Sequence, residues 1–166
     1  HYVDRVHKLG NIHQHLDLIA GLPYEDYESF GKSFNDLYAH EPDQLQLGFL
    51  KVLKGTVMEE EVKKYDIIYR NQSPYEVLGT KWLSYDEIIL LKGEELVELY
   101  YNSGQYALTL KYAVPFFESP FRFYEMFSAS YRKKGYHKLN HNRLEKYNIL
   151  REFLREHMQE VRWNIL

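Results

Sequence analysis

Two histidines and an aspartate alternate near the start of the sequence, within the segment NIHQHLDLIAGLPYEDYESF at residues 11–30. Single residues separate His13, His15 and Asp17, so on a β-strand all three side chains would point to the same side. Imidazole and carboxylate groups serve as metal ligands, as acid–base groups and as hydrogen-bond partners for polar ligands. This polar row is therefore a candidate functional site.

The row has three interpretations. His-x-His at the end of a barrel strand, with a carboxylate nearby, can hold zinc in a metal-dependent hydrolase, although such a site needs a further ligand. The other histidines are scattered along the chain. Alternatively, the row is structural: it lines a barrel interior, where buried polar groups find partners, or a surface where another domain packs. The third interpretation depends on a family resemblance of the surrounding residues.

The row lies on a predicted βαβ unit. Residues 12–20 alternate between apolar and polar side chains, which predicts a strand that ends at Gly21-Leu22-Pro23. Apolar residues at helical spacing over 27–37 predict a helix, and alternation over 45–49 predicts a second strand before Gly55. Strand, helix and strand in this order predict parallel strands with a right-handed crossover. Since parallel sheets usually have several strands, the unit is expected to belong to a larger sheet or barrel.

The chain after Gly55 is expected to be mainly helical, with one short strand at 65–69. Helices are expected at 59–64, from a capping box at Ser84 and Glu87 to about 101, at about 105–114 and at 120–134. A last helix begins at Asn142, and its expected apolar stripe is Leu144, Tyr147, Leu150, Leu154, Met158 and Val161.

Aromatic residues crowd the region around Pro115 and Pro120: Phe116, Phe117, Phe121, Phe123, Tyr124 and Phe127. They are expected to form a core between helices, or else a cover over a large planar substrate or cofactor. Trp82 is expected to be a packing anchor. The helical region could alternatively be a non-catalytic module that binds a partner through its aromatic helices.

The composition excludes several classes of function for this chain. No cysteine is present, so the chain itself holds no disulfide, thiolate-metal or iron–sulfur site. The formal net charge is −3, which argues against a nucleic-acid partner. No apolar run reaches the length of a membrane span and none resembles a signal peptide, so a cytoplasmic location is expected. Because the chain begins at His1 rather than methionine, we expect it to be part of a longer polypeptide.

The residues after the polar row carry a family resemblance. Asp17-Leu18-Ile19-Ala20-Gly21-Leu22-Pro23 and the later Lys54-Gly55-Thr56 resemble the closing strands of the radical S-adenosylmethionine (SAM) barrel, a partial TIM barrel. The departures are Tyr24, where glycine is commoner, and Val57, where proline is commoner. SPYEVLGTKWLSYDEI and VELYYNSGQY resemble the C-terminal helical module of cobalamin-binding radical SAM proteins, the group of anaerobic magnesium-protoporphyrin monomethyl ester oxidative cyclases and methyltransferases.

The resemblance implies a site and cofactors. It places Asp17 at the mouth where SAM binds, as an acceptor for a ribose hydroxyl, with Gly21, Leu22 and Pro23 passing close to the adenine. His13 and His15 would face the substrate or a cobalamin. A [4Fe-4S] cluster would be held by an upstream Cys-x-x-x-Cys-x-x-Cys loop, and cobalamin by an N-terminal domain, so this cysteine-free chain alone would be inactive.

The expected architecture therefore has two parts: the end of a barrel at 1–58 and a mainly α-helical module at 59–166. The expected partners are the upstream barrel and cobalamin domains of the same polypeptide. Because a βαβ unit removed from its barrel exposes strand edges and apolar faces, we expect self-association through residues 11–53.

Overall fold

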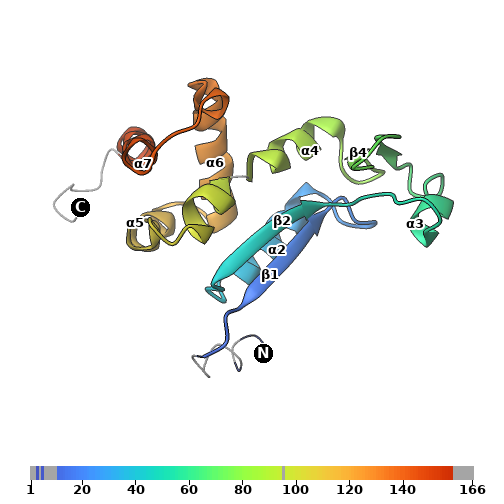
Figure 1. Ribbon diagram of the computed structural model, residues 1–166, viewed down its shortest axis with the longest axis horizontal. Helices are drawn as coiled ribbons and strands as arrows, with labels where there is room; N and C mark the ends of the chain where they lie inside the picture. The colour runs from blue at the N-terminus through green and yellow to red at the C-terminus, as the bar shows by residue number, and fades with distance from the viewer. Residues whose placement is uncertain (1–2, 4, 6–10, 95, 159–166) are drawn as a thin grey trace.

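A computed structural model describes residues 3, 5, 11–94 and 96–158. It begins with the βαβ unit: strand β1 (His15–Ala20), helix α2 (Tyr27–Tyr38) and strand β2 (Gln44–Phe49). The strands pair in parallel, with His15 opposite Gln44 and Ala20 opposite Phe49. Helix α2 lies along one face of this two-stranded sheet (Figure 1). The predicted parallel pair is confirmed.

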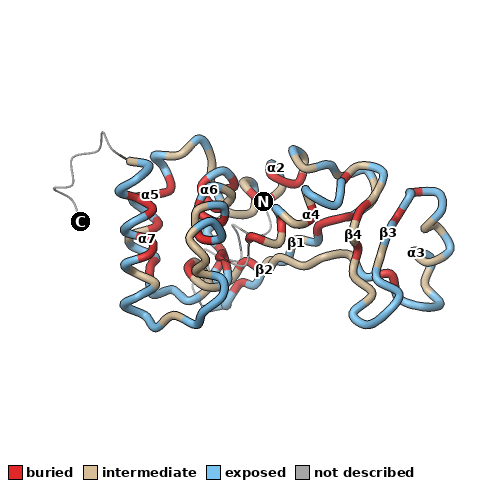
Figure 2. The backbone as a smooth tube through the Cα atoms, turned by 90° about the horizontal axis from the view of Figure 1, so that it is seen from above, coloured by how far each residue is buried: buried red, intermediate tan, exposed pale blue. Residues whose placement is uncertain are grey.

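The two faces of the sheet differ in burial. Leu16, Leu18 and Leu47 pack against the main core, to which Ala20 and Leu45 belong. Gln14 interrupts this apolar face, yet it is buried, and its side-chain amide donates a 2.8 Å hydrogen bond to the carbonyl of Val3. The residues between them on β1 are exposed, so burial alternates along the strand (Figure 2). The sheet is therefore covered on one face only.

Short, irregular elements follow β2. Helix α3 spans Val57–Glu60, and the antiparallel pair β3 (Ile68–Tyr69) and β4 (Val77–Gly79) lies beyond it. The prediction of a helix at 59–64 is wrong, because Thr56 takes the N-cap position and the helix ends before the lysines. Strand β4 was not predicted: its three residues are too few to show a period, and Gly79 weakens the strand pattern.

The rest of the described chain is helical. Its elements are α4 (Tyr85–Leu91), the 3₁₀ turn η1 (Lys92–Glu94), the π-helix η2 (Val97–Asn102), α5 (Ala107–Ala113), η3 (Val114–Phe116), α6 (Pro120–Lys133), η4 (Tyr136–Lys138) and α7 (Arg143–His157). The capping boxes predicted at Ser84 and at Asn142 are both present. The α/β start followed by a helical module is thus confirmed.

The single helix expected from Ser84 to about 101 is interrupted near Gly93. A Cβ atom there would lie 1.9 Å from Ser128 Oγ, so η1 and α6 cross at a distance that only glycine permits. The stripe predicted for α7 is partly wrong. Leu150 and Leu154 are buried, but Ile149 and Phe153 complete the buried face, Leu144 is exposed, and Val161 lies outside the described residues.

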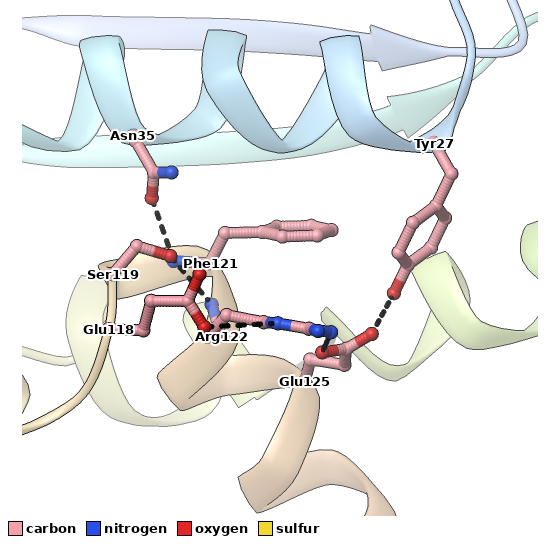
Figure 3. Close-up of polar contacts among 7 residues, drawn as sticks. All are labelled: Tyr27, Asn35, Glu118, Ser119, Phe121, Arg122 and Glu125. Carbon is pink, nitrogen blue, oxygen red and sulfur yellow. Dashed lines mark hydrogen bonds and ion pairs between the residues drawn. The ribbon is translucent and has the colours of Figure 1, made fainter.

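Helix α6 joins the helical module to α2 (Figure 3). The carbonyl oxygen of the Asn35 side chain accepts a 2.9 Å hydrogen bond from the Phe121 backbone N–H, in the first turn of α6. The Tyr27 hydroxyl donates to Glu125 at 2.6 Å, and Arg122 pairs with the same carboxylate. The Phe121 ring packs on Phe30 and Phe34 of α2. This junction holds the βαβ unit against the module.

Candidate functional site

The uncovered face of the sheet carries the polar row. The side chains of His15 and Asp17 are 44% and 64% exposed, and Asp17 stands beside the exposed Gln46 of β2 in the parallel register. Ile19, next on the same face, is also exposed. The face is therefore open to a ligand or to another part of the polypeptide.

The structure brings together two of the three members of the row. His15 Nε2 lies 3.1 Å from Asp17 Oδ1, so the imidazole can hold the carboxylate in one orientation. His13 precedes the strand and approaches Asp43 instead, with 3.7 Å between Nδ1 and Oδ2. The same Asp43 oxygen accepts a 2.7 Å hydrogen bond from the Gln14 backbone. His13 therefore belongs to the amino-terminal end of the sheet.

The turn Gly21-Leu22-Pro23 directly follows the carboxyl end of β1, and Gly21 lies four residues beyond the mid-strand Asp17. Gly21 has φ +89°, and a Cβ atom on it would lie 2.7 Å from Val77 of β4. The glycine is therefore required by the backbone angle and by the close approach of β4. Leu22 is exposed and Pro23 half-buried.

Tyr24 occupies the position where the resembled motif has glycine. Its φ of +69° lies in the left-handed region, which explains why glycine suits the position. The ring is 72% exposed, yet it contacts Trp82 at 4.7 Å and Tyr65 at 5.7 Å between centroids. These contacts connect the turn to the module and make Trp82 a packing anchor.

Glu25 and Asp26 follow the turn, and their pKa values are shifted in opposite directions. Partial burial raises the pKa of Glu25, opposed by a hydrogen bond from Ser33. Asp26 is the N-cap of α2, and hydrogen bonds from Ser29 lower its pKa. Helix α2 begins at Tyr27, directly after its N-cap Asp26 and three residues beyond the left-handed Tyr24.

The second motif lies beyond β2, near the same end of the sheet. Gly55 has φ +77° and Thr56 is the N-cap of α3, so Val57 takes the first helical position. Proline is favoured at that position because its φ is already helical. Tyr24 therefore keeps the left-handed conformation that suits glycine, and Val57 keeps the first helical position that suits proline. Both departures from the motif preserve its backbone conformation.

The zinc interpretation finds little support around the row. Within residues 11–94 and 96–158, no group of three or more His, Cys, Asp or Glu side chains is arranged to hold a metal ion. His15 and Asp17 form a pair, and His13 contacts Asp43 instead. His1 and His7 lie outside the described residues.

Most of the aromatic residues around Pro115 and Pro120 are core. Phe121, Phe123, Tyr124 and Phe127 are buried, Phe117 stacks on Phe153 of α7, and Phe116 is exposed. Sequence reasoning missed three polar neighbours of the row: Asp43, directly before β2, and Gln44 and Gln46 on β2. The only signal for them was the parallel register, which places β2 residues beside His15 and Asp17.

Comparisons place the helical module in a known family. The family model described as "Protein of unknown function (DUF4080)" matches residues 63–165. A search of curated proteins found no match to the chain. In the part of the chain that the structure describes, no helix is long and apolar enough to cross a membrane.

Proposed function

The chain belongs to the DUF4080 family, and we propose that it is the C-terminal part of a radical SAM enzyme. In this proposal residues 11–58 are the last strands of the SAM-binding barrel, and the helical module covers them on one side. The enzyme methylates or oxidatively cyclises an organic substrate, such as a tetrapyrrole, with a cobalamin domain elsewhere in the polypeptide. It is a cytoplasmic protein.

The observation that carries the proposal is the one-sided cover of the parallel sheet. In an α/β barrel the crossover helices lie outside and the other face of the sheet points into the barrel. Here α2 covers the apolar face, and the opposite face presents His15, Asp17 and Gln46. Parallel sheets are normally buried on both faces. A complete small domain is therefore not expected to leave polar residues on an uncovered face of such a sheet.

The residues present fit SAM. Asp17 offers an exposed carboxylate, a suitable acceptor for a ribose hydroxyl, and His15 at 3.1 Å can fix its orientation. Leu22 gives an exposed apolar surface at the carboxyl end of β1, where barrel enzymes bind their ligands. Bound to a reduced iron–sulfur cluster, SAM would supply radical chemistry for hydrogen abstraction from the substrate. The cluster ligands must come from elsewhere, since this chain has no cysteine.

The test is reductive cleavage of SAM. The polypeptide with its natural upstream region is purified without oxygen, reconstituted with iron and sulfide, and mixed with dithionite and SAM. The proposal predicts 5′-deoxyadenosine as a product, and an upstream Cys-x-x-x-Cys-x-x-Cys loop. It would be refuted by a natural polypeptide that lacks this loop, or by one that holds the cluster without cleaving SAM.

A further inference from the structure

An exposed apolar stripe runs along α5 and η3. It consists of Leu108, Tyr112 and Phe116, which follow one another at intervals of four residues and are 70%, 51% and 57% exposed. Residues four apart lie on the same face of a helix, so the three side chains form one continuous row. Leu110 and Ala113 of α5 are buried against the core instead. Single exposed apolar residues are normal on a protein surface, but a contiguous apolar patch marks a place where something binds.

Helix α7 lies beside α5 and runs in the same direction (Figure 1). At the start of both helices, the Tyr106 hydroxyl donates a 3.0 Å hydrogen bond to the carbonyl of Arg143. At the far end, the Phe117 ring stacks on Phe153 of α7 with 5.7 Å between centroids. The chain therefore leaves α7 near Phe116, at one end of the stripe.

The residues that follow α7 have the sequence pattern of an extended segment with one apolar side. In QEVRWNIL at 159–166, here called the tail, Val161, Trp163 and Ile165 alternate with Arg162 and Asn164. In an extended chain the three apolar side chains point to one side and the two polar side chains to the other. The family match extends to residue 165, so the tail belongs to the helical module.

The apolar row of the tail and the stripe have similar lengths. The helix rises about 12 Å from Leu108 to Phe116, at about 1.5 Å per residue. An extended chain spans about 13 Å from Val161 to Ile165, at about 3.3 Å per residue. Because the chain leaves α7 near Phe116, a reversal at 159–160 brings the tail back along the stripe. The three apolar residues of the tail then meet the three residues of the stripe one by one.

We infer that the stripe is the docking site of the tail of the same chain: residues 161–165 lie on it in extended form, antiparallel to α7, with Trp163 against Tyr112. An aromatic pair at the centre of the contact buries the largest area, so Trp163 is the anchor. The occupant is the chain's own tail rather than that of a second copy, because a short covalent connection gives an effective concentration of roughly millimolar. This docking is independent of the proposed function.

Single cysteines test the docking, because the chain has no cysteine of its own. Leu108→Cys places a thiol on the stripe, and its reaction with 5,5′-dithiobis(2-nitrobenzoate) is followed with the natural tail and with Trp163→Ala. The reaction should be at least about tenfold slower with the natural tail, because the docked segment must open before the reagent reaches the thiol. Leu139→Cys is the matched control, since Leu139 is 71% exposed against 70% for Leu108 but lies outside the stripe. Its rate should be the same with both tails.

Two results would overturn the inference. Equal rates at position 108 with the natural tail and with Trp163→Ala would mean that the tail does not cover the stripe. A slow reaction that becomes faster on dilution would assign the covering tail to a second copy of the chain. Neither readout involves SAM, so failure of this docking leaves the proposed function untouched, and absence of SAM cleavage leaves the docking untouched.

Discussion

At the scale of the residue, two tyrosines near the sheet are notable: one has an unfavourable backbone conformation, and the other has surroundings that raise its pKa. Tyr24 has a left-handed backbone, and its ring contacts with Trp82 and Tyr65 offset that cost. Tyr38, at the end of α2, lies in surroundings that disfavour its ionised form. A single substitution at each tyrosine can measure each effect.

Replacing Tyr24 separates its backbone from its ring. Tyr24→Ala and Tyr24→Gly both lose the aromatic contacts, but only glycine relieves the left-handed conformation, so Tyr24→Gly should be more stable by about 1 kcal/mol. Urea unfolding of the two variants measures this difference. Equal stabilities would mean that the backbone relaxes once the ring is removed.

Burial raises the pKa of Tyr38 to about 12, opposed by a hydrogen bond with Tyr124. The unfolded chain loses this proton near pH 10 and the folded chain only near pH 12, so stability falls as pH rises through that window. The fall is at most about 1.4 kcal/mol per pH unit for one such group. Tyr38→Phe should therefore lose less stability than wild type between pH 10 and 11. Parallel curves for the two proteins in urea unfolding would contradict this.

At the scale of the element, capping residues and one glycine determine where helices begin and change. The sequence predicted the helix starts at Ser84, at residue 120 and at Asn142, and in each case a capping side chain acts within its own turn. It could not predict the break near Gly93, because the cause lies on α6, at Ser128. Local sequence signals were thus sufficient to predict where helices start, but not where a helix is interrupted.

The cap of α7 is a direct test of this local control. Asn142 Oδ1 accepts a 3.0 Å hydrogen bond from Glu145 N, and Asn142→Ala removes it. The variant should lose about 1 kcal/mol of stability. Asn140→Ala, exposed and two residues before the cap, is the control and should change stability little. A similar loss in both variants, measured by thermal or urea unfolding, would argue against the cap.

The crossing of η1 and α6 can be tested by compensation. Gly93→Ala places a Cβ atom 2.8 Å from Ser128 Cβ as well as against its hydroxyl, so it should cost about 2–3 kcal/mol. Adding Ser128→Gly, which removes both atoms, should recover part of that loss despite its own cost in a helix. A double variant as unstable as the sum of the single variants would show that the two positions do not collide.

At the scale of the whole molecule, the sequence predicted the architecture better than the site. The alternation of apolar residues in β1 and β2 was sufficient to predict the parallel pair. The capping signals were sufficient to predict the helical module. The divergence of His13 toward Asp43 could not be predicted, since it depends on where the strand begins and on its neighbour. The hydrogen bonds between Asn102 and Leu45 were equally hidden, because 57 residues separate the two positions.

The central claim is that the open face of the sheet binds SAM through Asp17. We would measure SAM binding by calorimetry to the polypeptide with its natural upstream region, as wild type, Asp17→Asn and the control Asp36→Asn, an exposed position on α2. Loss of a charged hydrogen-bond acceptor should weaken binding about 10- to 100-fold in Asp17→Asn and leave the control unchanged. Equal affinity in all three proteins would contradict the account.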